Sequence, residues 1–237
     1  MPNYKIITDK KLLLEFIDWL PDLEKNEIYY VCLFARSKYQ DPNNKTISHI
    51  TTDKAQLKRF TSTKERLFSK IQQLECPIGA YKQYGVTKPT VDIPQETLAL
   101  YITPNPRNVM KATKGCIKKF VDLIVDGNDH IIDPHRFAMS EIQRSKARTE
   151  YVDFDFDNAL WQSWKDDINE ILPKDSYKVL NTRGGFHLLV NPRLAGGLGH
   201  KWHQKLSSIS SLDQSGDIMI PVPGTYQGGF TPYFEKL

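Results

Sequence analysis

Apolar and polar residues follow two different rhythms along the chain. In Lys11–Leu20, Ser62–Leu74 and Val109–Val125 the apolar positions recur every three or four residues, which predicts amphipathic helices. Ile28–Ala35 is a continuous apolar run that is typical of a buried strand, and Thr97–Thr103 alternates as a strand does. These patterns predict a small α/β unit over residues 1–145.

From residue 146 onward the predicted order is strand, helix, strand, strand, helix, strand. The segments are Glu150–Phe156, Ala159–Leu172, Tyr177–Leu180, Phe186–Val190, Gly199–Ile209 and Ile218–Val222. This is the split βαβ order, in which the first and third strands are central and both helices cover one sheet face. We therefore predict an α+β fold, with an RRM-like unit at residues 146–237 whose other sheet face is open. The polar stretch Ser140–Thr149 is the predicted seam between the units.

Strand parity separates the side chains of the first predicted strand. Because successive side chains point to opposite faces, Val152, Phe154 and Phe156 should meet the helices. Asp153 and Asp155 should then lie together on the open face. The same parity places His187 of the third strand on that face.

Two carboxylates that project the same way can share a hard divalent cation through oxygen ligands. The alternative interpretation is a solvated acidic edge strand. The turn before His187 adds a second indication, because Arg183 is cationic and the backbone N–H groups of Gly184 and Gly185 can approach an anion closely. Its alternative interpretation is an ordinary Gly-Gly hairpin.

Composition narrows the protein class only a little. The 237 residues carry a formal charge of +4, which is compatible with a polyanionic partner. The three cysteines are about forty residues apart, so we expect no structural zinc. No apolar run is long enough to span a bilayer, and the first residues lack the apolar core of a signal peptide, so we expect a cytoplasmic protein without membrane partners.

Three short motifs resemble those of the archaeo-eukaryotic primase superfamily, the primase-polymerase proteins. They are Asp153–Phe154–Asp155, Gly185–Phe186–His187 and Leu212–Asp213, in the same order. Pro223–Gly224–Thr225 and Asn105–Pro106–Arg107 resemble two flanking elements of that family. The resemblance covers roughly residues 97–227.

The resemblance implies a nucleotidyltransferase that uses a template and two Mg²⁺ or Mn²⁺ ions. It implies that Asp153, Asp155 and Asp213 hold the metals, and Asp217 is the alternative third ligand because it fits strand parity. His187 would be catalytic and, with the Arg183–Gly185 turn and Arg107, would contact the nucleotide. The implied partners are nucleoside triphosphates, a DNA or RNA template-primer, and a helicase or accessory priming subunit. A bare core of this kind suits a phage or plasmid origin.

The sequence also departs from the family. An arginine usually precedes the Pro-Gly-Thr element, whereas this chain has Ile218–Val222 there. Two other functions remain open at this point. A non-catalytic RRM-like module would use the open sheet face to bind nucleic acid, and a metal-dependent nuclease would use the same carboxylates.

Overall fold

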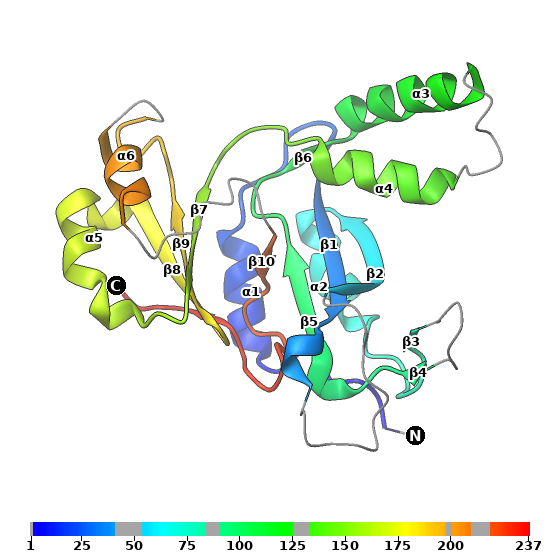
Figure 1. Cartoon of the computed structure of the whole chain (residues 1–237), viewed down its shortest axis with the longest axis horizontal. Helices are drawn as coiled ribbons and strands as arrows, with labels where there is room; N and C mark the ends of the chain where they lie inside the picture. Colours follow the sequence, from blue (N-terminus) through cyan, green and yellow to red (C-terminus); the bar gives the residue numbers. More distant parts are fainter. Residues whose placement is uncertain (1, 41–53, 84–90, 126–132, 198–200, 210–218) are drawn as a thin grey trace.

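Two antiparallel sheets lie side by side, and most strands of the chain belong to one or the other (Figure 1). The computed structural model describes residues 2–40, 54–83, 91–125, 133–197, 201–209 and 219–237. The first sheet has the order β10 (Ile220–Pro221), β5 (Leu98–Ile102), β1 (Glu27–Ala35), β2 (Ala55–Ser62), and β6 (Arg107–Asn108) pairs with the start of β1. The second has the order β11 (Tyr233–Phe234), β8 (Tyr177–Thr182), β9 (Gly185–Val190), β7 (Val152–Asp157). A small hairpin pairs β3 (Lys82–Gln83) with β4 (Val91–Asp92).

The described residues form six α-helices: α1 (Lys10–Trp19), α2 (Lys64–Gln72), α3 (Val109–Val125), α4 (Pro134–Arg144), α5 (Lys165–Ile171) and α6 (Lys201–Ser207). Together with the two sheets, they confirm the mixed α+β class predicted from the sequence. None of the helices in the described segments is long and apolar enough to cross a membrane.

Strand β1 is apolar from Ile28 to Ala35 because both of its faces are covered. Its residues Val31 and Leu33 pack into a core with α1 and α2. The alternate residues Tyr30 and Cys32 pack with Met139 of α4 on the other face. A strand buried on both sides has no polar alternation, which explains the continuous run at Ile28–Ala35.

The second sheet buries one face against α5 and α6, as strand parity predicts. Phe154 and Phe156 of β7 lie in this core, and so does Phe186 of β9, whose ring is stacked on Phe156 at a centroid distance of 4.4 Å. Ile168 of α5 and Leu206 of α6 cover them. We call the opposite face, which carries Asp153, Asp155 and His187, the inner face.

The strand order of the second sheet differs from the prediction. β9 is central as expected, but β7 lies at an edge, and within the described chain it pairs only with β9. The prediction that the last strand, Ile218–Val222, belongs to the second sheet is wrong. Its described part contains β10, which pairs with β5 of the first sheet, while β11 takes the fourth place beside β8. The predicted boundary at residue 145 stays a prediction, but strand pairing crosses it.

The inner face is not the fully open surface that the sequence predicted. Leu180 of β8 and Leu189 of β9 point from this face into the core of the first sheet, and both are completely buried. Helix α1 supports the contact, since Trp19 lies 4.7 Å from Phe234 of β11 and 4.6 Å from Tyr151, between ring centroids. Parity remains correct, but the sequence did not reveal that the other sheet covers part of this face.

Other local predictions failed for identifiable reasons. The sequence pattern does not reveal β2, because most of its positions are exposed or partly exposed and few of them are apolar. α4 was missed although Asp133 caps it and Pro134 opens it, a recognisable start signal. The predicted helix Ala159–Leu172 is a 3₁₀ turn, Trp161–Ser163, followed by α5, and Leu160 is exposed.

Candidate active site on the inner face

The pairing of β7 with β9 builds the site. Asp155 lies directly opposite His187 in the antiparallel register, and Asp153 lies opposite Leu189. The three polar side chains share the inner face because their positions have the same parity. The structure therefore brings together the two carboxylates and the histidine that the sequence predicted as neighbours.

Asp153 and His187 form a buried pair. The Nδ1 atom of His187 lies 3.0 Å from Oδ1 and 3.2 Å from Oδ2 of Asp153, and the two residues are only 7% and 2% exposed. Burial alone lowers the pKa of His187, but the charge and hydrogen bond of Asp153, with the charges of Asp155 and Asp157, raise the pKa to about 9. The imidazole is then positively charged at neutral pH and donates to the carboxylate.

Asp155 is the more accessible of the two carboxylates. Its side chain is 30% exposed, and its Oδ1 atom lies 3.7 Å from Nε2 of His187. The imidazole thus lies between the two carboxylates and reduces their repulsion. Asp155 faces solvent, whereas Asp153 is oriented by the histidine.

The glycine turn is required by the backbone of β7. Gly185 has φ of +150°, and a Cβ atom there would lie 1.9 Å from the carbonyl oxygen of Phe156. Gly184 has more room, because the nearest atom to its Cβ position is Asp157 Oδ1 at 4.0 Å. The N–H of Gly184 donates to Thr182 Oγ1 at 3.3 Å, within the turn. Close packing therefore explains Gly185 without an anion.

Arg183 reaches from this turn toward the first sheet. The guanidinium carbon of Arg183 lies 4.4 Å from the ring centroid of Tyr39, and the backbone N–H of Arg183 donates to Gln227 Oε1 at 3.0 Å. Gln227 Nε2 in turn donates to the hydroxyl of Tyr39 at 3.1 Å. Tyr39 and Gln227, neither of which was selected by sequence reasoning, hold Arg183 in place. Its contact with a nucleotide stays a prediction.

Arg107 is 1% exposed in β6, so its side chain is covered in this conformation. Its neighbour Asn105 has the clearer structural role, which sequence reasoning missed. The amide of Asn105 donates to the carbonyl of Tyr151 at 2.8 Å, and its oxygen accepts from the N–H groups of Glu150 and Tyr151 at 2.8 and 2.9 Å. These bonds fix the backbone immediately before β7.

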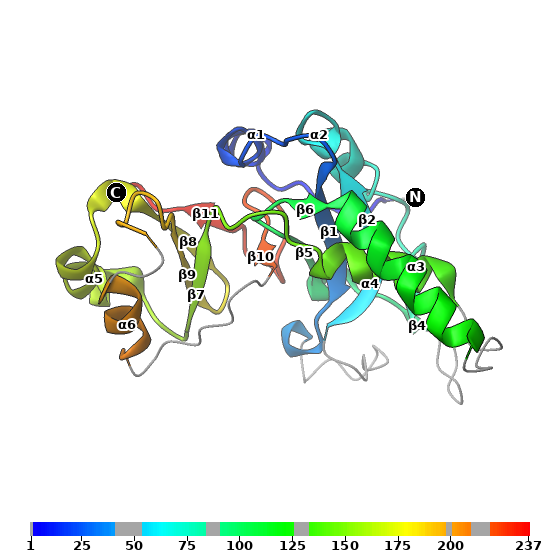
Figure 2. The same cartoon turned by 90° about the horizontal axis from the view of Figure 1, so that it is seen from above.

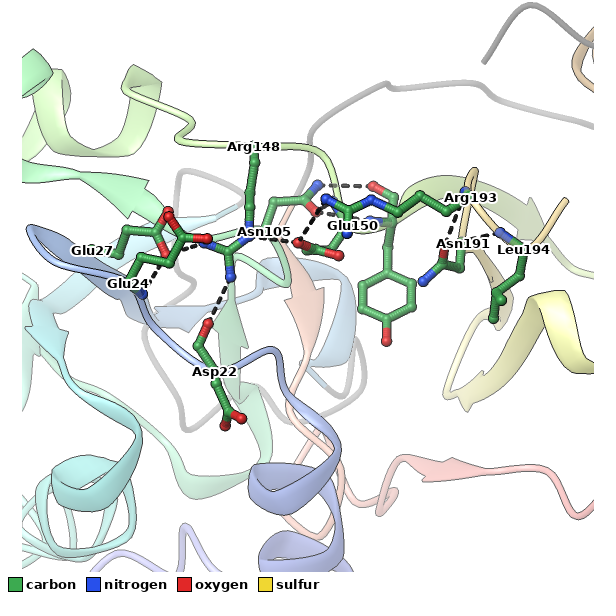
Figure 3. A network of polar contacts seen from close by, with 10 residues as sticks. Asp22, Glu24, Glu27, Asn105, Arg148, Glu150, Asn191, Arg193 and Leu194 are labelled. Atoms are coloured by element: carbon green, nitrogen blue, oxygen red, sulfur yellow. Dashed lines mark hydrogen bonds and ion pairs between the residues drawn. The ribbon is translucent and has the colours of Figure 1, made fainter. Parts of the chain in front are cut away.

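An ion network around Arg148 holds the same segment (Figure 3). Its Nε donates to Glu150 at 2.5 Å, another guanidinium nitrogen donates to the carbonyl of Asp22 at 2.6 Å, and a third pairs with the buried carboxylate of Glu27 in β1. Arg193, after β9, lies 3.9 Å from Glu150. The network joins the first sheet to the entrance of β7.

The donor set suits a hard divalent cation but is incomplete in the described segments, which contain no group of three His, Cys, Asp or Glu placed to hold a metal. Asp213 and Asp217, the two candidates for the third ligand, lie outside the described residues. Asp153 can serve both His187 and a cation, because an ionised carboxylate accepts about four hydrogen bonds. Asp153 and Asp155 therefore fit as two ligands of such a site.

No family model, no curated protein and no solved structure matches this chain.

Gly185→Ala should destabilise the protein by about 3 kcal/mol or more, because the new methyl group meets the Phe156 carbonyl and the backbone is strained. Gly184→Ala is the matched control and should change stability by less than about 1 kcal/mol. Chemical denaturation measures both. Equal effects would contradict the packing explanation.

Asn105→Ala should lower the free energy of unfolding by about 2–4 kcal/mol, because three backbone groups lose their partner. Asn108→Ala removes an asparagine that makes one exposed bond, to the N–H of Lys111, and should cost about 1 kcal/mol. Urea titration of both variants tests the difference. A loss at Asn105 no larger than at Asn108 would show that the segment before β7 is held by other contacts.

Proposed function

We propose that this chain is a template-directed nucleotidyltransferase of the primase-polymerase kind. The observation that carries the proposal is the convergence of Asp153, Asp155 and His187 on the inner face, where the two carboxylates suit a divalent cation. Mg²⁺ or Mn²⁺ bound there would activate a primer hydroxyl and stabilise the leaving pyrophosphate. The third ligand is proposed to be Asp213, with Asp217 as the alternative.

Each residue of the pair has a separable task in this proposal. Asp155, which is partly exposed, would be the ligand that a cation reaches from solvent, while Asp153, whose orientation is set by His187, would be the second ligand. Nε2 of His187, which lies 3.7 Å from Asp155 Oδ1, is the ring nitrogen that would contact a phosphate, since Nδ1 is directed at Asp153. Arg183, held by Tyr39 and Gln227, would supply positive charge to the same triphosphate.

The side chains of the inner face fit an RRM-like nucleic-acid-binding module less well than they fit a metal-dependent enzyme. Such modules bind bases on exposed aromatic side chains. Here the neighbours of His187 on the inner face are Leu180 and Leu189, which are buried under the first sheet, and two carboxylates that repel phosphate. A metal-dependent nuclease would use the same carboxylates and is distinguished by its product.

Asp155→Asn should lower primer extension at least about 100-fold, because the loss of a metal ligand removes several kcal/mol of transition-state stabilisation. Asp153→Asn should do the same. Asparagine is preferred to alanine at this buried position, since it keeps the volume and a partner for His187. The assay follows a labelled primer on a template with Mn²⁺ or Mg²⁺ and nucleoside triphosphates.

Glu170→Gln is the matched control, because it removes an exposed carboxylate from α5, on the opposite side of the sheet. It should extend the primer at the parent rate. Extension by Asp155→Asn at that rate would reject the site. Shortening of the primer by the parent protein, without extension, would reject polymerisation in favour of a nuclease.

Mn²⁺ with a nucleoside triphosphate should raise the melting temperature of the parent protein by about 5 °C when the ligands are at a hundred times their dissociation constants. The shift arises because the ligands bind only the folded state. Asp155→Asn should show a much smaller shift, whereas Glu170→Gln should match the parent. Equal shifts in all three proteins would place the bound metal elsewhere.

A further inference from the structure

Helix α3 has two apolar faces, and one of them packs against α4. The packed face meets α4, where Phe120 and Phe137 lie edge to face at 5.8 Å between ring centroids and Lys119 pairs with Glu141. The other face carries large apolar side chains that are 50–78% exposed: Met110, Ile117, Val121, Ile124 and Val125. We call these five residues the α3 stripe.

The α3 stripe runs along one side of the helix. Its members are mainly three, four or seven residues apart, so they lie along one side of α3 over about 22 Å, or four helical turns. The α3–α4 pair projects from the first sheet, on the side away from the second sheet (Figures 1 and 2). A row of exposed apolar side chains on a projecting helix is typical of an interaction surface.

Exposed lysines lie within the stripe and along one of its borders. Lys114 lies between Met110 and Val121 on the helix surface, and Lys111 and Lys118 lie on the border, together with the acidic residue Asp122. At the N-terminal end of α3 there is a hollow of about 340 Å³. It is lined by Asn108, Met110, Lys111, Lys114, Lys146 and Ala147. Met110 belongs to both the hollow and the stripe, so apolar and cationic surfaces are continuous.

We propose that the α3 stripe and this lysine-lined hollow bind an acidic amphipathic helix of a partner protein. Apolar side chains of that helix would cover Ile117, Val121 and Ile124, and its carboxylates would meet Lys111 and Lys114. Complementary charge at the border of an apolar contact selects the partner and its orientation. The proposal does not depend on the proposed catalytic function.

Other occupants fit the surface less well. If α3 paired along its whole length with α3 of a second copy, parallel or antiparallel, the Lys114–Lys118 segments would lie near each other and repel. A membrane surface favours lysines on both borders of an apolar face, and here they lie on one. A nucleic-acid backbone would gain nothing from the row of exposed isoleucine and valine side chains.

Two labelled synthetic peptides test the proposal with the full chain. Both are four-turn amphipathic helices with the same leucine face; one has glutamates on its polar face and the other has lysines. Fluorescence anisotropy should show that the glutamate peptide binds at least about tenfold more tightly. The double variant Ile117→Ser, Val121→Ser should lose this binding about tenfold, and Lys114→Glu with Lys118→Glu should reverse the preference.

Leu160→Ser is the matched control, because Leu160 is exposed to a similar degree but lies before α5 in the second half of the chain. It should bind the glutamate peptide as the parent does. Equal affinity of the parent for both peptides would overturn the proposal. So would stripe-dependent dimers in sedimentation, or stripe-dependent binding to phosphatidylserine vesicles or duplex DNA in preference to the glutamate peptide.

Discussion

Three hydrogen bonds from one side chain set the position of the acidic strand. Asn105, at the end of the first sheet, holds the backbone of Glu150 and Tyr151, and β7 begins at the next residue. Within the described residues, β7 pairs with β9 alone. The clamp by Asn105, reinforced by Arg148 and Glu27, restrains the start of the strand, and the directions of Asp153 and Asp155 follow from it.

Burial then gives the two carboxylates different properties. A buried carboxylate is stable only with a compensating charge or hydrogen bonds, and His187 provides both to Asp153. Asp155, two residues further, keeps contact with solvent. One strand therefore presents an oriented acid and an accessible acid side by side. The asymmetry arises because the first sheet covers Leu189, which lies opposite Asp153, whereas Asp157 at the end of β7 is exposed.

Local patterns in the sequence predicted what depends on local geometry. The bounds of α3, the inward residues Phe154 and Phe186, and the shared face of Asp155 and His187 follow from helical and strand periodicity. Pairing partners could not be predicted in the same way. β10 and β11 are two residues long, and a short apolar segment such as Ile220–Pro221 can satisfy either sheet, so its choice is decided by long-range packing.

The exchange of strands also shows why the inner face belongs to both sheets. After β10 pairs with β5 in the first sheet, the chain passes Gln227, which holds Tyr39 and Arg183, and returns to the second sheet at β11. This return encloses Leu180 and brings Phe234 against Phe16 and Trp19 of α1. Gln227 thus restrains the turn before β9, and Asn105 restrains the start of β7. Both residues are distant in sequence from the strands that they hold. The geometry of the inner face is therefore a tertiary property, which neither half of the chain contains in its own pattern.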